Sequence, residues 1–399
     1  MKRSYEIQIS EHLNQHRQMV FLSGPRQVGK TTLCTRLDTK GEYLNWDDQD
    51  NRAILIEGPR RVAEETGLNV LKKEKKTIVF DEIHKYSQWK DFLKGFFDSY
   101  GSQFRIVVTG SSKLDIYKKG GDSLMGRYFP YRLHPFSVRE IIDPHIHNQE
   151  IQTPKPLDSD SFNSLFTFGG FPEPFLKSDK RFYNRWRKLR QQQLFSEDIR
   201  DFTQIQEIHQ LELMAEILQH QTGQLLNYST LSKKIRVSVD TIRRWLITLN
   251  SLFYCFSIQP WHRNIPRSLL KQPKVFLWDW SMITDNGTRT ENFVASHLMK
   301  AVNWWTDNGY GEYGLYFLRD KDKKEVDFLV TRDQTPWFIV EVKSGKSNSI
   351  SRHLSYFQNC TKAMHAFQIS FAMDYVDMDC FSRSLPTIVP AKTFLSQLV

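Results

Sequence analysis

Cysteine is scarce in this sequence, and its placement excludes two classes of site. Four cysteines occur among 399 residues, at positions 34, 255, 360 and 380. No two of them form a Cys-x-x-Cys pair, and no histidine spacing typical of a zinc site accompanies them. We therefore expect reduced thiols, as in a cytoplasmic protein, and neither a disulfide framework nor a structural zinc.

Long apolar runs, internal repeats and low-complexity tracts are also missing. No stretch approaches the roughly 18 consecutive apolar residues of a membrane-spanning helix. The N-terminal residues Met-Lys-Arg-Ser-Tyr-Glu begin an amphipathic pattern, unlike the uniformly apolar core of a signal peptide. We expect a cytoplasmic protein without a membrane partner.

The composition that is present belongs to a globular protein of two or three domains. Apolar residues make up 40% and charged residues 25% of the chain. Lys and Arg number 55 against 45 Asp and Glu, which gives a net charge of +10. This excess favours a polyanionic partner, although proteins without one often carry a similar charge.

The first third of the chain predicts an α/β fold with a parallel sheet. Short apolar strands are expected at Met19–Ser23, Thr77–Phe80 and Phe104–Thr109, with helices at about 5–17 and from Lys30 onward. Short apolar strands that alternate with helices indicate a parallel sheet covered on both faces. From about 164 to 260 the pattern is mainly helical, and strand-like runs return at Lys274–Trp278, Leu315–Leu318, Glu325–Arg332 and Trp337–Val342.

A glycine-rich loop between the first strand and its helix predicts an ATP site. Glycines at 24 and 29 allow a tight turn whose N–H groups point at phosphate oxygens, and the following helix adds its positive end. Lys30 is expected to reach the β- and γ-phosphates, and Thr31 to ligate magnesium. The expected nucleotide-binding residues of the loop are Gly24, Pro25, Arg26, Gln27, Val28, Gly29, Lys30, Thr31 and Thr32.

The second strand runs into Asp81 and Glu82, as a Walker B strand does. Asp81 is expected to hold the magnesium through water, and Glu82 to act as the general base toward the attacking water. A helix cap is the alternative for this pair, but the preceding P-loop favours catalysis. His84, two residues further on, is interpreted as structural.

Two further groups are candidates near the phosphates. Thr109 and Ser111 end the third strand, where either a sensor of the γ-phosphate or a simple turn is expected. Arg127 follows in a basic, glycine-rich stretch. It is a catalytic candidate that would act in cis, or in trans within a homo-oligomer, and the alternative is a solvated surface arginine.

The pattern of residues 208–260 resembles a winged helix. It predicts helices at Leu211–His220, Thr230–Ile235 and Thr241–Leu252, with Ser238 as an N-cap and a wing strand at Phe253–Ile258. On the third helix the inward stripe is Ile242, Trp245, Leu246 and Leu249.

Basic residues surround this third helix and predict contact with DNA. Between 231 and 275 there are nine Lys or Arg residues against one acid, Asp240. The expected DNA-binding residues are Lys233, Lys234, Arg243 and Arg244, with the helix in the major groove. A lid or a protein-contact module is the alternative, and the sequence leaves both open.

The last strands predict a hairpin that brings two carboxylates together. A three-residue loop, Asp333-Gln334-Thr335, would pair Arg332 with Pro336 and so place Asp327 opposite Glu341. A slip by one residue would misalign both apolar faces, so the hydrophobic pattern favours this register.

These two carboxylates and Lys343 would form a magnesium site with a neighbouring amine, similar to a nuclease site. Glu291 lies upstream of them, in a helical stretch at Thr290–Lys300. The alternative is a surface hairpin with an exposed ion pair between Glu341 and Lys343.

Taken in order, the motifs resemble a prokaryotic family of AAA-like P-loop ATPases whose C-terminal domain long had no assigned function. The resemblance covers nearly the whole chain and rests on residues 24–32, 81–83, 109–112, 126–127, 133–140, 169–172, 273–276, 291–294, 325–327 and 341–343. One departure is at 278–282, Trp-Asp-Trp-Ser-Met, where the family has Asp-x-Gly-Leu and where the missing glycine puts the backbone turn in question.

The resemblance implies an AAA-like ATPase domain (1–160), a helical lid and winged-helix region (161–265) and a C-terminal domain similar to PD-(D/E)xK nucleases (266–399). In those nucleases, residues placed like Glu291, Asp327 and Glu341 hold a metal, and one like Lys343 assists catalysis. We expect an ATP- and Mg²⁺-dependent ATPase that acts on DNA with a nuclease-like domain. The alternatives are an ATP-regulated switch whose nuclease-like domain is inactive, and a protein without a nucleic-acid role.

Overall fold

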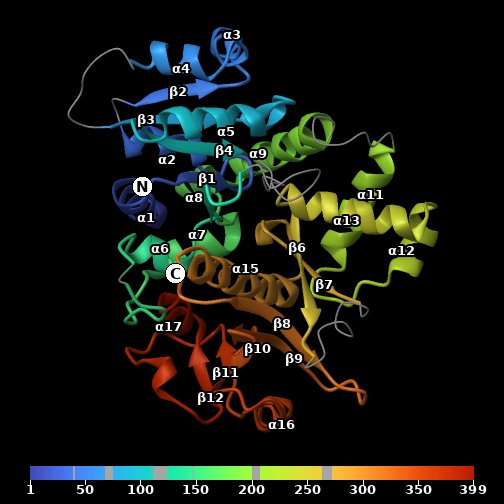
Figure 1. Ribbon diagram of the computed structural model, residues 1–399. Helices are drawn as coiled ribbons and strands as arrows, with labels where there is room; N and C mark the ends of the chain where they lie inside the picture. Colours follow the sequence, from blue (N-terminus) through green and yellow to red (C-terminus); the bar gives the residue numbers. More distant parts are fainter. Residues whose placement is uncertain (39–40, 68–74, 111–123, 147, 200–206, 263–271) are drawn as a thin grey trace. The chain divides into compact units, whose positions relative to one another are not determined.

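In the computed structural model, residues 1–399 are described except for 39–40, 68–74, 111–123, 147, 200–206 and 263–271. The chain divides into two compact units, Met1–His134 and Pro135–Val399. The first is drawn in blue to green and the second in green to red (Figure 1). Among the described helices, none combines the length and the apolar character that crossing a membrane requires.

The first unit is built on a five-stranded sheet in which all paired strands are parallel. The strand order is β2-β3-β4-β1-β5. The strands are β1 (Met19–Ser23), β2 (Glu42–Asn45), β3 (Lys76–Asp81), β4 (Phe104–Gly110) and β5 (Tyr128–Arg132). Because β1, β3 and β4 lie inside the sheet, nearly all of their residues are buried, and this is why they read as continuous apolar runs.

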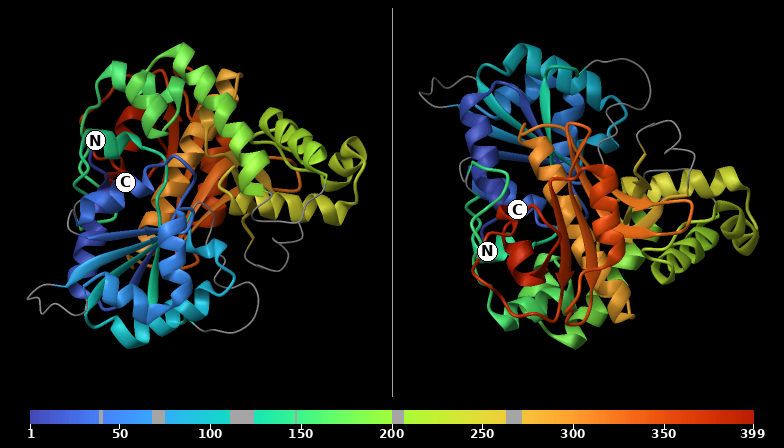
Figure 2. Two further views of the ribbon diagram at one scale, coloured as in Figure 1. Left: turned by 90° about the horizontal axis from the view of Figure 1, so that it is seen from above. Right: turned by 90° about the horizontal axis from the view of Figure 1, so that it is seen from below.

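Helices connect these strands and cover the sheet, as the two views of Figure 2 show. They are α1 (Ser4–Gln15), α2 (Lys30–Leu37), α3 (Gln49–Glu57), α4 (Pro59–Glu65), the short 3-10 helix η1 (Ile83–Lys85) and α5 (Trp89–Tyr100). The apolar face of α5 buries Phe92, Leu93, Phe96 and Phe97 against the sheet residues Phe80, Phe104 and Ile106. The predicted parallel α/β domain is therefore confirmed.

Two strands of this sheet, β2 and β5, were not predicted, and in each case there is a physical reason. Strand β2 has four residues, of which only Leu44 is buried. Among the described strands, β5 pairs with β1 alone and lies at the edge of the sheet, where Pro130 is tolerated and Phe129 is exposed. Short or edge strands do not need the apolar runs that reveal central strands.

The second unit begins with helices. They are α6 (Val138–Ile142), α7 (Ser159–Phe168), α8 (Pro172–Lys177), α9 (Lys180–Gln193), η2 (Leu194–Asp198), α11 (Ile208–His220), α12 (Tyr228–Ile235) and α13 (Val239–Ser251). The predicted N-cap is present, since the Ser238 side chain accepts a hydrogen bond from the Thr241 N–H at 3.0 Å. The predicted inward stripe of α13 is buried throughout.

A seven-stranded sheet follows, in the order β12-β11-β10-β9-β8-β6-β7. Its strands are β6 (Cys255–Pro260), β7 (Lys274–Leu277), β8 (Tyr313–Arg319), β9 (Glu325–Arg332), β10 (Thr335–Lys343), β11 (His365–Ser370) and β12 (Thr387–Pro390). The remaining helices are η3 (Trp280–Met282), α15 (Asn286–Asp307), α16 (Arg352–Thr361), η4 (Cys380–Ser382) and α17 (Ala391–Ser396). Helix α15 packs across β7, β8, β9 and β10 (Figure 1).

The predicted turn at residues 278–282 forms without a glycine. Residues Trp280–Met282 make the 3-10 helix η3, and the Asp279 side chain accepts a hydrogen bond from the Ser281 N–H. No residue of this segment has a positive φ. The departure from the family pattern is therefore accommodated by a conformation that side chains tolerate.

The predicted wing strand, β6, belongs both to the winged-helix hairpin and to the C-terminal sheet. An antiparallel bridge joins Leu225 to Lys274, and β7 pairs with β6, so α11, α12, α13 and this hairpin have the order of a winged helix. Yet β6 also pairs with β8 through Gln259 and Pro260 and thereby continues into the C-terminal sheet. The observed units thus differ from the expected domain limits at 160 and 265: residues 135–160 group with the second unit, and no break separates the helical region from the last domain.

Candidate nucleotide site and carboxylate cluster

The loop between β1 and α2 has the backbone conformation that a phosphate-binding loop needs. Gly29 has φ +97° and Gln27 has φ +64°, so the chain passes twice through the left-handed region. At Gly24 a Cβ atom would lie 2.4 Å from the Leu133 carbonyl oxygen. Glycine is therefore required at 24 for close approach and at 29 for its conformation, as the spacing predicts.

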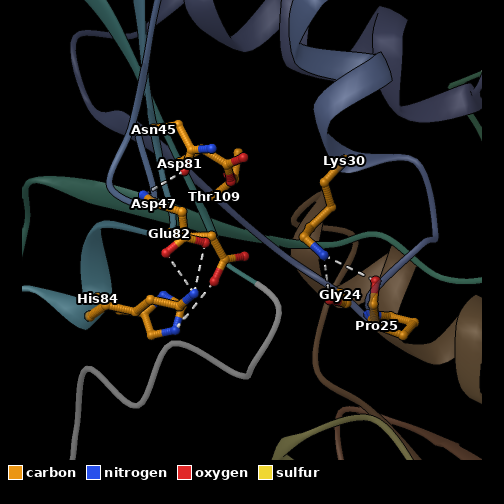
Figure 3. A network of polar contacts seen from close by, with 10 residues as sticks. Gly24, Pro25, Lys30, Asn45, Asp47, Asp81, Glu82, His84 and Thr109 are labelled. Carbon is orange, nitrogen blue, oxygen red and sulfur yellow. Dashed lines mark hydrogen bonds and ion pairs between the residues drawn. The ribbon is translucent and has the colours of Figure 1, made fainter. Parts of the chain in front are cut away.

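The side chain of Lys30, the first residue of α2, contacts the backbone of this loop. Its ammonium group donates to the carbonyl oxygens of Gly24 at 2.9 Å and Pro25 at 3.0 Å, and the residue is only 7% exposed (Figure 3). The side chain is thus already held beside the loop whose N–H groups would bind phosphate. Phosphate oxygens would have to replace these carbonyl partners when a nucleotide binds.

Asp81 ends β3 as a buried carboxylate with two hydroxyl donors. Tyr43 donates to one of its oxygens and Thr109 to the other. Burial and then the negative charge of Asp81 raise the pKa of Tyr43 above its ordinary value, so the hydroxyl remains a donor. Thr109, expected as a γ-phosphate sensor or a turn residue, instead binds this Walker B side chain.

The same tyrosine tests whether a magnesium ion fits between the two motifs. The Tyr43 hydroxyl lies 3.4 Å from Thr31 Oγ1 while it is bonded to Asp81. The Tyr43 hydroxyl oxygen therefore contacts both Thr31 and Asp81, so these two predicted magnesium ligands lie close together. Hydroxyl and carboxylate oxygens are ligands that suit Mg²⁺. The residues present fit the ion.

Glu82 has a backbone conformation that is unusual for a residue with a side chain. Its φ is +54°, and its N–H donates to the Thr109 carbonyl oxygen at 3.2 Å, which holds the residue beside the end of β4. The carboxylate lies 3.7 Å from His84 Nε2 (Figure 3). Burial lowers the pKa of His84, with Glu82 opposing the shift. Non-glycine residues in the left-handed region often mark functional sites.

Two groups were missed by the sequence interpretation. Tyr43 belongs to β2, a strand too short to be predicted. Arg3 precedes α1 and donates to the carbonyl oxygens of Val28 in the P-loop at 2.7 Å and of His134 at 2.5 Å. Neither has a sequence motif, because each reaches the site only through the folding of distant segments.

Arg127 does not lie where a cis-acting arginine is needed. It directly precedes β5, and its carbonyl oxygen accepts from the Met19 N–H at the start of β1, whereas the P-loop follows the other end of β1. Four strand steps separate the two ends by about 13 Å. The guanidinium instead pairs with Asp98 at 2.8 Å. This position does not favour the cis role, and the catalytic role of Arg127, in cis or in trans, stays a prediction. Ser111 lies outside the described residues.

The predicted DNA-binding residues lie exposed on two helices of the second unit. Lys233 and Lys234 are on α12, and Arg243 and Arg244 are on α13. Three of the nine basic residues counted in the sequence, at 263, 267 and 271, fall outside the described ranges. Lys274 must be removed from this basic surface, because it is buried.

The C-terminal hairpin has the predicted register at its carboxylates, although its loop differs from the predicted one. Arg332 pairs with Thr335, so the loop has two residues and not three, and Asp333 and Gln334 both have positive φ. A bulge at Trp337 then restores the expected pairing at Phe338 and Val330. Continued by one step, this register sets Asp327 opposite Glu341.

The hairpin is not a surface feature. Strands β9 and β10 lie inside the seven-stranded sheet, and the Glu341 side chain is 9% exposed. Glu341 does pair with Lys343 at 2.6 Å, while the Val342 N–H donates to Asp327 Oδ2 at 2.8 Å. The ion pair is therefore only partly exposed: Lys343 is half-exposed, whereas Glu341 is buried.

Lys274 joins this cluster from β7. Its ammonium lies 2.6 Å from Glu325 and 3.4 Å from Glu291, and Glu325 also pairs with Arg319. Burial and then the charge of Asp327 raise the pKa of Glu291 to about 7. Burial lowers the pKa of Lys274, but Glu291, Asp327 and Glu325 raise it by more, so the lysine remains charged.

These residues do not fit a divalent ion as they stand. Within the described ranges, no group of three or more His, Cys, Asp or Glu side chains could hold a metal. One oxygen of each predicted ligand is bonded inside the protein: Glu291 to Lys274, Asp327 to the Val342 N–H and Glu341 to Lys343. The metal role of the three carboxylates stays a prediction from the sequence.

Comparison with protein families supports the assignment of the first site. Residues 16–142 match a family described as an AAA domain. Residues 159–286 and 286–392 match two families described as domains of unknown function, DUF8612 and DUF4143. This match supports an AAA-like P-loop domain in the first part of the chain. The matches to the rest assign no activity, and none of them is a nuclease family.

Relatives over most of the chain are themselves uncharacterized. Proteins of Mycobacterium bovis and Mycobacterium tuberculosis are 24% identical over 84% of this chain and 72% of their own length. A Methanocaldococcus jannaschii protein is 22% identical over 77% of this chain and 70% of its own.

Similarity to solved structures is weak. The Walker-type ATPase of Pyrococcus abyssi is 12% identical with a TM-score of 0.41, over 70% of this chain and 93% of that one. AMPPCP-bound DnaA of Aquifex aeolicus is 13% identical with a TM-score of 0.31, over 62% and 87%. At these scores the similarity carries no functional argument.

Proposed function

We propose that this protein binds ATP at residues 24–32 and hydrolyses it with Glu82 as the general base. One observation carries the proposal: the loop with Lys30, the buried Asp81 and the left-handed Glu82 all follow the carboxyl ends of strands in one parallel sheet. Ligands of open parallel sheets bind at this edge. Glu82 stands at the N-cap position of η1, but its side chain makes no capping hydrogen bond there.

Each side chain has a separate task in this reaction. Lys30 would leave the carbonyl groups of Gly24 and Pro25 and bind β- and γ-phosphate oxygens, while the loop N–H groups bind the others. Glu82 would accept a proton from the attacking water as the water oxygen bonds to the γ-phosphorus and the bond to the ADP oxygen breaks. Thr109 would keep Asp81 in place.

Magnesium belongs to this proposal as a cofactor of the nucleotide. Thr31 and Asp81 would hold it, the latter through water. When bound, the ion neutralises charge on the β- and γ-phosphates.

Substitution of Lys30 and Glu82 tests the proposal. We expect Lys30→Ala to abolish ATP binding, because the buried ammonium is lost. Glu82→Gln should retain binding and lower turnover by roughly 10²–10⁴-fold, because the amide cannot accept the proton. Calorimetric titration with ATP and a phosphate-release assay measure the two effects.

A matched control is Lys76→Ala. Lys76 pairs with Glu42 at the opposite end of β3 from Asp81, so both binding and turnover should remain. Full turnover in Glu82→Gln would contradict the role of the base, and ATP binding by Lys30→Ala would contradict the site itself.

DNA binding is a second candidate function, and the exposed basic residues of α12 and α13 support it. Four of them project from the helices of a winged-helix arrangement, where the third helix is the one that enters a major groove. We propose that the ATPase acts on DNA through this surface. For the C-terminal cluster, the ion pairs of Lys274 favour the alternative in which the nuclease-like domain is inactive.

A further inference from the structure

The C-terminal carboxylate cluster already contains a cation, which pairs with Glu291 and Glu325. Lys274 is 3% exposed, and its ammonium contacts one carboxylate from α15 and one from β9. The ring of Phe317 lies under the same ammonium, 5.5 Å away. A charge that is so enclosed must be balanced by its neighbours, and here two carboxylates do so.

The backbone fixes Lys274 in this position. It pairs with Ile258 in β6 on one side and forms a bridge with Leu225 on the other. Flanking residues add hydrogen bonds, from the Gly223 N–H to the Val275 carbonyl at 3.0 Å and from the Leu226 N–H to the Pro273 carbonyl at 2.8 Å. The backbone of Lys274 therefore cannot shift without disturbing the winged-helix hairpin.

Glu291 is equally confined. Gly223 has φ +76°, and a Cβ atom at this residue would lie 3.2 Å from Glu291 Oε2. The backbone thus covers the carboxylate that reaches Lys274.

One atom of the cluster lacks a partner among the described groups. Glu341 Oε2 is buried and accepts no hydrogen bond, although the other oxygen pairs with Lys343. A buried carboxylate oxygen without a donor is costly. This oxygen would be available as a ligand to a cation that entered the cluster.

We propose that the Lys274 ammonium takes the place of a divalent metal ion in this carboxylate cluster and thereby prevents metal binding. A metal ion bound by Glu291 and Asp327 would lie close to the Lys274 ammonium, and the two positive charges would repel each other. The cluster then acts as a charged connection between the winged-helix hairpin and the sheet. The inference is independent of the proposed ATPase function, since it concerns residues of the second unit.

Mn²⁺ binding measured by electron paramagnetic resonance tests the proposal. The full chain is used with Asp81→Asn in every sample and without nucleotide, so that the N-terminal site does not contribute. We expect this parent to bind no Mn²⁺ in the cluster. Lys274→Met should bind one ion, at least about tenfold more tightly than any residual binding by the parent, and Asp327→Asn added to it should remove that ion.

Controls separate charge from shape. Lys274→Arg keeps the charge and should bind no more Mn²⁺ than the parent. Lys346→Met removes an exposed lysine beyond β10 and should likewise change nothing. Lys274→Gln, which keeps hydrogen-bond donors without charge, is the second variant if Lys274→Met fails to fold.

Two results would overturn the proposal. The first is Mn²⁺ binding by the parent protein, with Lys274 in place, that is lost when Asp327→Asn is added. The second is a folded Lys274→Met or Lys274→Gln protein that gains no Mn²⁺. Loss of ATP hydrolysis in Glu82→Gln is unaffected by either result, so the two proposals fail separately.

Discussion

At the scale of single residues, Asp81 illustrates how a buried carboxylate is prepared for a ligand. Its two oxygens are each engaged by a hydroxyl, from Tyr43 on β2 and Thr109 on β4, the strands on either side of β3. Hydrogen bonds to a charged group are stronger than neutral ones. Asp81 is thereby held in one orientation before any magnesium arrives.

The Tyr43 hydroxyl should therefore contribute to stability without nucleotide. We expect Tyr43→Phe to lower the free energy of unfolding of the nucleotide-free protein by about 1.5–3 kcal/mol, because a buried charged acceptor loses its donor. Urea unfolding followed by tryptophan fluorescence measures it. The control is Tyr86→Phe, whose hydroxyl bonds to Gln88 at the surface and whose loss should cost less than about 0.5 kcal/mol. Equal effects would contradict the argument.

At the scale of secondary structure, the β9–β10 hairpin shows two irregularities that compensate. The tight turn shortens the loop by one residue, and the bulge at Trp337 adds that residue back. Register over the buried part of the hairpin is thus governed by the apolar faces, and the loop adapts to it. The turn has a cost, because Gln334 is held at φ +65°.

Replacing this glutamine should stabilise the hairpin. Gln334→Gly removes left-handed strain of about 1–2 kcal/mol and adds about 0.5–1 kcal/mol of unfolded-state entropy, so a net gain of about 0.5–1 kcal/mol is expected. Chemical denaturation measures it. Asp333→Gly is the contrasting variant: the Asp333 side chain accepts from the Glu312 N–H at 2.8 Å, and its removal should cancel the gain. No gain from Gln334→Gly would mean that the turn is unstrained.

At the scale of the whole molecule, part of the basic excess of the chain forms an exposed surface in the second unit. Exposed basic side chains gather on α12 and α13, whereas Lys274 is neutralised in the carboxylate cluster. A surface of this kind binds duplex DNA mainly through phosphates, with a steep dependence on salt. ATP would act on such binding only if it bound two states of the protein unequally.

We expect salt-dependent DNA binding that weakens when Arg243 and Arg244 are both replaced by alanine. The slope of log affinity against log salt should fall by about 0.9 for each phosphate that the protein no longer neutralises, or about 2 for both arginines. Fluorescence anisotropy with a labelled duplex at several salt concentrations measures it. The charge-matched control replaces Arg181 and Arg185, exposed on α9, and should leave the slope unchanged. Equal slopes in all three proteins would favour a protein-contact role for the winged helix.

Features that depend on local pattern can be read from the amino-acid sequence without a structure. The P-loop, the Asp81-Glu82 pair, the stripe of α13 and the pairing of Asp327 with Glu341 follow from spacing and periodicity, since neighbours along the chain define them. Strand order is not a local property, because each strand can pair with partners far away in sequence. The fold was needed to establish that Tyr43 reaches Asp81, that Arg127 lies at the far end of β1, and that Lys274 fills the carboxylate cluster.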